Sequence, residues 1–71
     1  MKNKIEFNAV QFISECLYEY SLRNAKPLKV CVEEFRRFGF FDLLWQGYLN
    51  LVSLGVSAVV TLLENKKKAG N

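Results

Sequence analysis

Histidine is absent from this 71-residue sequence, and glycine, proline and cysteine are scarce. Without an imidazole, the chain has no histidine general base and no histidine metal ligand. The four glycines are spread from residue 39 to residue 70, too far apart for a phosphate-binding loop. The adjacent Glu33 and Glu34 point to different sides of a helix and cannot act as a catalytic pair. We therefore expect no catalytic, metal-binding or cofactor-binding residues, and no enzymatic activity.

The chain also lacks a charge imbalance outside its last residues. Ten Lys and Arg residues stand against seven Asp and Glu residues. Without Lys66, Lys67 and Lys68, seven basic residues remain against seven acidic ones, so the rest of the chain is neutral. A nucleic-acid-binding domain normally carries its basic residues along one face or helix. We expect residues 66–71 to form a basic disordered tail, and we expect no nucleic-acid partner.

Residues 1–7 contain no apolar segment typical of a signal peptide and are predicted to be a flexible lead-in. A chain of this kind is expected in the cytoplasm, where thiols stay reduced. Cys16 and Cys31 fall on the apolar stripes of predicted helices, and their spacing does not match a zinc site. We expect both to be buried, reduced thiols that pack as small hydrophobic side chains.

The sequence does contain apolar residues at helical spacing. They recur with the 3.6-residue period of an amphipathic helix in four segments. The predicted helices cover residues 8–24, 28–38, 42–54 and 57–65. Short links between amphipathic helices favour antiparallel neighbours. We therefore predict one all-α domain over residues 8–65, a small bundle of three to four short antiparallel helices.

Single residues mark the ends of these helices. Asn8 is suited to cap the first helix, and Pro27 is suited to the first turn of the second. Gly39 follows the last apolar residue of the second helix, where a left-handed C-cap usually needs glycine. Asp42 is expected as the cap or first-turn acid of the third helix, since a carboxylate is stabilised by a helix N-terminus. Gly55 separates the third helix from the fourth, and both glycines are predicted to have positive φ.

From Leu43 to Leu63 the chain runs twenty-one residues without a charge. One helix of that length would cross a bilayer about 30 Å thick, which makes a single-pass membrane peptide spanning 43–63 an alternative. However, Gln46 and Asn50 are unfavourable inside a bilayer without a polar partner. We favour two short helices broken at Gly55, and we keep a membrane as the less favoured partner.

The hydrophobic content of 51% is high for a short chain, which cannot enclose so much apolar surface. A contiguous exposed patch usually indicates a partner. Because Trp and Tyr are frequent interface anchors, the candidate partner-binding residues are Phe40, Phe41, Trp45 and Tyr48. Each of them is equally compatible with a place in the core. Since most homo-oligomers are two-fold symmetric, we expect a homodimer with Trp45 in its seam.

Part of the chain, residues 12–63, resembles an uncharacterised bacterial family of short all-helical proteins known as a domain of unknown function. The matching residues are Phe12, Cys16, Tyr20, Phe35, Phe38, Gly39, Phe40, Asp42, Leu44, Tyr48, Leu51 and Gly55. Two features depart from that family: Val52, Ser53 and Leu54 replace a His-Thr-Gln trio, and the last helix ends in lysines instead of acids. The family is similar to small accessory or antitoxin-like proteins, which implies a protein partner.

We therefore predict a small bacterial protein-interaction module that binds through an apolar and aromatic helical surface. Its predicted role is antitoxin-like or accessory. A further alternative is a helix-turn-helix DNA binder built around Gly39. The helix that would read the bases in that arrangement carries no Lys or Arg. Binding to protein therefore remains the favoured prediction.

Overall fold

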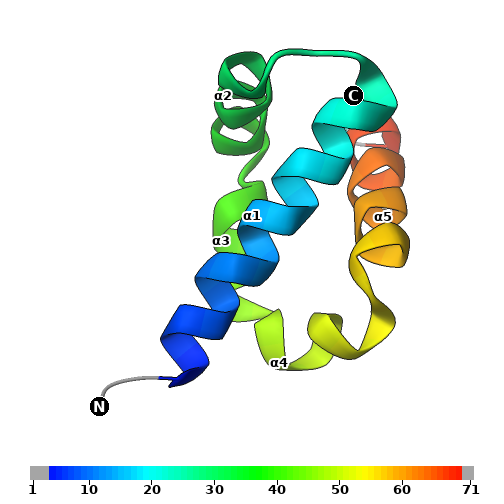
Figure 1. Ribbon diagram of the computed structural model, residues 1–71. Helices are drawn as coiled ribbons and strands as arrows, with labels where there is room; N and C mark the ends of the chain where they lie inside the picture. The colour runs from blue at the N-terminus through cyan, green and yellow to red at the C-terminus, as the bar shows by residue number, and fades with distance from the viewer. Residues whose placement is uncertain (1–3, 70–71) are drawn as a thin grey trace.

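Helix α1 (Lys4–Asn24) packs against three of the other helices in the computed structural model, which describes residues 4–69 (Figure 1). The chain then descends through α2 (Leu28–Phe38), α3 (Phe40–Gln46) and α4 (Tyr48–Leu51) to a 3₁₀ helix, η1 (Val52–Leu54). Helix α5 (Val56–Ala69) returns to the end of the molecule where α1 finishes. Residues 4–69 contain no β-strand. The predicted small all-α bundle is therefore confirmed, but residues 4–69 form five α-helices where three to four were expected, and α2, α3 and α4 follow one another in one direction between the opposed α1 and α5.

The start of α1 corrects the expected flexible lead-in and the expected cap at Asn8. The helix already includes Lys4, so Asn8 is an exposed residue of its interior. Once a helix has formed, each added residue gains a backbone hydrogen bond at small cost, and no residue between Lys4 and Asn8 interrupts that series. Residues 1–3 lie outside the described part of the chain.

Gly39 ends α2 and precedes α3 directly. Its φ of 74° and ψ of 21° place it in the left-handed region, as predicted. Its N–H donates to the Arg36 carbonyl at 3.3 Å, which satisfies an acceptor at the end of α2. Helix α3 starts at Phe40, so Asp42 is a first-turn acid and not the cap.

The uncharged run from Leu43 to Leu63 is broken at two glycines. Gly55 has a φ of 93°, as predicted, but the expected single helix over residues 42–54 is wrong because the chain also bends at Gly47. A β-carbon on Gly47 would lie 3.0 Å from the Leu43 carbonyl oxygen and 3.1 Å from Cδ1 of Leu51. Glycine therefore allows the close approach between the end of α3 and the start of α4.

Within residues 4–69, no single helix has both the length and the apolar character needed to cross a membrane. The segments Tyr48–Leu54 and Val56–Ala69 pass that test only together, and they meet at an angle of 114°.

An aromatic cluster occupies the centre of the bundle. The Phe35 ring lies 5.1 Å from the Tyr20 ring and 5.4 Å from each of the Phe40 and Phe41 rings, measured between centroids. Such edge-on and tilted pairs add stability beyond their buried area. Helix α5 completes the core with Val59, Val60 and Leu63, each no more than 1% exposed.

The two cysteines lie in the same core and are fully buried free thiols, as predicted. Burial in apolar surroundings, with a smaller effect from the neighbouring Glu15, raises the pKa of the Cys16 thiol to about 12. Cys16 is therefore protonated at neutral pH and packs as a small hydrophobic side chain.

The expected basic tail over residues 66–71 also needs correction. Helix α5 continues through Lys66, Lys67 and Lys68 to Ala69, and residues 70–71 lie outside the described part. The lysines remain helical because one of them bonds to the rest of the bundle: the Lys67 ammonium donates to the Tyr20 hydroxyl at 3.1 Å.

Candidate protein-interaction surface

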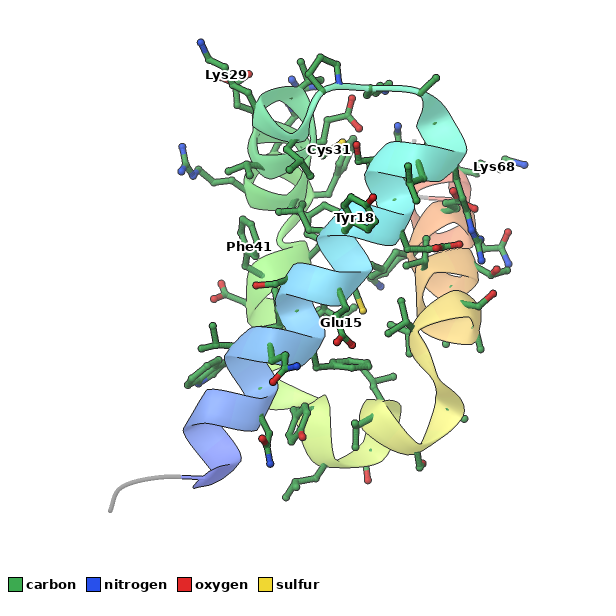
Figure 2. The ribbon with its side chains drawn as sticks, viewed as in Figure 1. Glu15, Tyr18, Lys29, Cys31, Phe41 and Lys68 are labelled. Carbon is green, nitrogen blue, oxygen red and sulfur yellow. The ribbon has the colours of Figure 1, made fainter. Side chains whose placement is uncertain are left out.

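The four aromatic residues predicted to bind a partner occupy different environments. Phe40 is 1% exposed and belongs to the core, so its expected place on the binding surface is wrong. Phe41, labelled in Figure 2, is half-buried beside the ring of Phe35, and Tyr48 is half-buried with its ring 5.7 Å from that of Phe12. Trp45 is 48% exposed. Trp45 is therefore the most accessible of the four.

Two of these residues line a groove between α1 and α3, which we call the Trp45 groove. It has a volume of about 420 Å³. Its lining residues are Val10, Ile13, Ser14, Phe41, Asp42 and Trp45. Val10 on α1 is 53% exposed and faces this groove from the side opposite Trp45. The structure thus brings Phe41 and Trp45 together, while Phe40 and Tyr48 are not among its lining residues.

A second groove lies on the other side of α3, between α3–α4 and α5, and we call it the α3–α5 groove. It has a volume of about 250 Å³. Its lining residues are Leu43, Gly47, Asn50, Leu51, Val59, Leu62, Leu63 and Lys66. Only Asn50 and Lys66 among them carry polar side chains, and Leu43 and Leu62 are 38% and 48% exposed. The groove therefore offers apolar surface that the bundle itself leaves uncovered.

Sequence reasoning missed Leu43 and Leu62 as surface residues. Leu62 belongs to the predicted apolar stripe of the last helix, which indicates burial. One signal for Leu43 was available. It lies about 200° around the helix from Trp45, since successive residues are separated by 100°. A helix that is apolar on two such faces has more apolar surface than one packed face requires.

Exposed apolar side chains are frequent along the uncharged segment. Leu49 on α4 is 71% exposed, and Leu54 at the end of η1 is 53% exposed. Together with Leu43, Trp45 and Leu62, they surround α3, α4 and the first half of α5 with accessible apolar groups. Clustered exposure of this kind is the usual mark of an interaction surface.

A group of polar side chains joins α1, α2 and α5 at the opposite end of the bundle, and we call it the Glu34 cluster: Tyr20, Lys26, Glu34 and Lys67. The Tyr20 hydroxyl donates to one carboxylate oxygen of Glu34 at 2.6 Å, and the Lys26 ammonium donates to the other at 2.6 Å. Lys67 lies 3.4 Å from the first of these oxygens. Three donors thus converge on a carboxylate whose side chain is 13% exposed.

The contacts of Glu34 change its titration. Hydrogen bonds from Lys26, and then from Tyr20 and Lys67, lower the pKa of Glu34 to about 2. Burial, followed by the hydrogen bond to the Glu34 carboxylate, raises the pKa of Tyr20 above its ordinary range. Glu34 is therefore ionised and Tyr20 is neutral at physiological pH, which suits a structural donor–acceptor pair and not a tyrosinate nucleophile.

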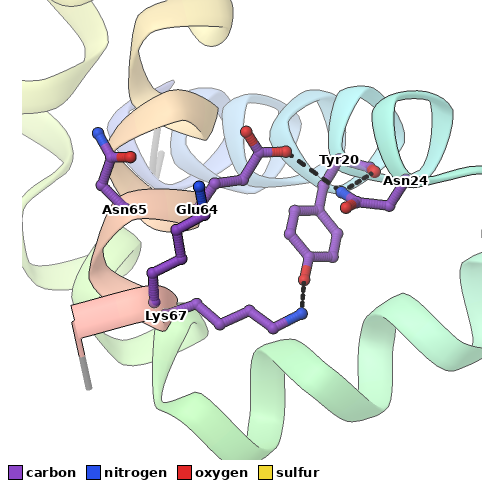
Figure 3. A pocket seen from close by; sticks show the side chains of 6 residues that line it. Tyr20, Asn24, Glu64, Asn65 and Lys67 are labelled. Carbon is purple, nitrogen blue, oxygen red and sulfur yellow. Dashed lines mark hydrogen bonds between the residues drawn. The ribbon is translucent and has the colours of Figure 1, made fainter. Parts of the chain in front are cut away.

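Beside this cluster lies a polar hollow of about 390 Å³, shown in Figure 3. In it, Asn24 donates to Glu64 at 3.2 Å and Lys67 donates to Tyr20. Arg23, the residue before Asn24 on α1, donates to Glu64 at 3.2 Å and to the Ser57 carbonyl at 2.9 Å. These polar groups bond to one another, and their structural role is to connect α1 to α5. Among the side chains that the structure describes, those of residues 8–69, no group of three or more His, Cys, Asp or Glu is arranged to hold a metal ion.

No protein-family model, curated protein or solved structure matches this chain. Of its surface features, the two apolar grooves beside α3 are best suited to contact another molecule, because their exposed side chains gain most from leaving water.

Proposed function

We propose that this chain is a protein-interaction module that binds through the apolar surface on both sides of α3. The observation that carries the proposal is the pair of grooves, each lined mainly by apolar side chains and each bordered by a half-exposed large residue, Trp45 or Leu62. Helix α3 lies between the two grooves, so a partner can contact it from either side.

The physical gain from covering this surface is substantial for so small a protein. A Trp side chain buries roughly 150–250 Å² when fully enclosed. Covering the exposed half of Trp45 would therefore remove about 100 Å² from water and contribute about 2.5 kcal/mol. Similar contributions from Leu43 and Leu62 would offset part of the entropy lost on association.

The charge distribution favours protein over nucleic acid as the partner. The one charged side chain on α3 is Asp42, which is exposed and would repel phosphate groups. The lysines of α5 lie beyond the uncharged segment, and one of them contacts Tyr20 and Glu34. A helix reading DNA from the position of α3 would need basic or polar side chains along its outer face.

Site-specific photo-crosslinking tests this proposal. A photoreactive phenylalanine analogue placed at Trp45 or at Leu62, in the cells that make the protein, should give discrete protein adducts of defined mass. The same group at the exposed Glu33 on α2 is the matched control and should give none. Each adduct protein is then purified and titrated against the wild-type chain and against Trp45→Asp and Leu62→Asp.

Binding that either substitution weakens would support the proposal. Equal adduct formation at all three positions, or adducts with lipid alone, would refute it.

A further inference from the structure

We infer that the α3–α5 groove is covered by the same groove of a second copy of this chain, in a two-fold symmetric antiparallel dimer. This inference rests on the proposed function and specifies one of its partners. It also moves the seam of the expected homodimer from Trp45 to Leu62.

The size of the groove favours inserted side chains over a small ligand. Its volume of about 250 Å³ falls below the range of about 300–1,000 Å³ that is typical of ligand pockets. It suits one or two aliphatic side chains from a facing helix. Gly47 contributes no side chain to the lining, and the side chain of Leu51 packs against its backbone and forms part of the groove wall.

The same face carries the group that would fill the groove. Leu62 lies on its border and is 48% exposed. A two-fold interface requires one surface to hold both the protruding and the receiving feature, because each copy presents the same patch. In such a pair, Leu62 of each copy enters the groove of the other, close to the symmetry axis.

The polar residues of the groove select the antiparallel arrangement. Helix α5 runs opposite to α3 and α4, and the two polar residues that line the groove come from these opposed segments, Lys66 from α5 and Asn50 from α4. Antiparallel copies place the Lys66 ammonium of one beside the Asn50 side-chain carbonyl of the other. The Lys66–Lys68 clusters then lie at opposite ends of the interface, whereas a parallel arrangement would bring them together and cost like-charge repulsion.

The absence of charge between Leu43 and Leu63 favours a second copy as the occupant. An apolar face of this kind needs a facing surface that also carries no charge, since an unpaired charge would lose its hydration on contact. The face of another copy meets that condition from Leu43 to Leu63, and its charged lining residue, Lys66, has Asn50 as a polar partner in the antiparallel pair. A standard interface covers about 800 Å² per partner, which is roughly a sixth of the 4826 Å² that the chain exposes.

Sedimentation equilibrium at neutral pH, up to high micromolar concentration, tests the inference with the whole chain. The wild type should follow a monomer–dimer equilibrium, and Leu62→Asp should weaken it by at least about tenfold. Leu28→Asp is the matched control, because Leu28 on α2 is 47% exposed, close to the 48% of Leu62, and lies outside the groove. That control and Trp45→Ala should leave the equilibrium unchanged.

A second experiment does not depend on a disruptive substitution. Leu62→Cys should form a disulfide-linked dimer under mild oxidation, because the two copies of residue 62 lie near the symmetry axis. Leu28→Cys, on α2 and outside the groove, should not. The native Cys16 and Cys31 do not interfere, since both are fully buried.

The outcomes separate this inference from the proposed function. A wild-type mass of one chain at every concentration would overturn the dimer. A dimer weakened by Trp45→Ala and not by Leu62→Asp would overturn its placement. If the wild type is a monomer at every concentration, protein adducts at Trp45 or Leu62 would still support the proposed function with a foreign partner. A monomer that also gives no protein adducts would refute both the dimer and the proposed function.

Discussion

Replacing Glu34 by glutamine should destabilise the fold by about 2 kcal/mol at pH 7. Glutamine keeps the shape of the side chain and can still accept the hydrogen bond from Tyr20, but it removes the charge that Lys26 and Lys67 contact. The pKa of Glu34 lies at about 2, against an ordinary value of 4.5. Each unit of difference corresponds to about 1.4 kcal/mol, so the upper bound is about 3.4 kcal/mol. Residual exposure and screening reduce it to about 2 kcal/mol.

The pH dependence gives the sign of this effect. Because the pKa is lower in the folded state, the folded protein holds the ionised form more strongly than the unfolded chain does. The stabilisation is therefore complete above about pH 4.5 and is lost as the pH falls toward about 2. The difference between wild type and Glu34→Gln should be largest near neutral pH and should shrink through this window.

Thermal and urea denaturation from pH 7 to pH 2, followed by circular dichroism, measures this difference. A loss of about 2 kcal/mol in a domain of this size lowers Tm by roughly 8–16 °C at neutral pH. Glu33→Gln is the matched control, since Glu33 is an exposed neighbour on the same helix. A constant gap between wild type and Glu34→Gln from pH 7 to pH 2 would refute the role of the Glu34 charge.

Three further predictions concern backbone, thiols and the last helix. In urea denaturation, Gly55→Ala should lower the free energy of unfolding by about 1–3 kcal/mol and Gly39→Ala by about 1 kcal/mol. Gly55 has a φ of 93° and a ψ of 153°, a conformation essentially restricted to glycine, whereas the left-handed conformation of Gly39 is open to other residues at a smaller cost. Equal losses for the two variants would contradict this prediction. Cys16 and Cys31 should resist a thiol reagent in the native protein and react at once in denaturant, since both are fully buried, and fast native labelling would disprove that burial. Lys67→Met should lower the free energy of unfolding by about 1 kcal/mol, because it removes the hydrogen bonds to Tyr20 and Glu34. Lys68→Met is the control and should have a smaller effect, since Lys68 is exposed. Equal effects of the two substitutions would show that the Lys67 bonds add no stability.

The helices themselves could be predicted from sequence because local patterns decide them. Apolar spacing identified the segments, and Gly39 and Gly55 have the positive φ that their positions indicated. The bend at Gly47 could not be predicted in this way. Its φ of −95° is open to any residue, and the requirement for glycine comes from atoms of Leu43 and Leu51 that only the folded chain brings close.

The surface was harder to predict than the fold. Phe40 and Trp45 are both aromatic residues of the same short helix, yet one is in the core and the other is half exposed. The way α2 and α3 join at Gly39 decides which face of α3 turns toward the core. Residue type alone does not predict that face. Glu19 and Arg23 form an i,i+4 ion pair at 3.0 Å, whose spacing a sequence shows directly, but the contacts of Arg23 with α5 join residues more than thirty positions apart.

The contact between Tyr20 and Lys67 joins residues separated by 47 positions, and this separation has a consequence during synthesis. A ribosome adds about 5–20 residues per second, so roughly 2–9 s pass between the two residues. Throughout that interval the apolar face of α1 lacks Val59, Val60 and Leu63, which complete its core. The nascent chain therefore cannot finish folding until α5 has emerged, and chaperones meet it first as an exposed amphipathic helix.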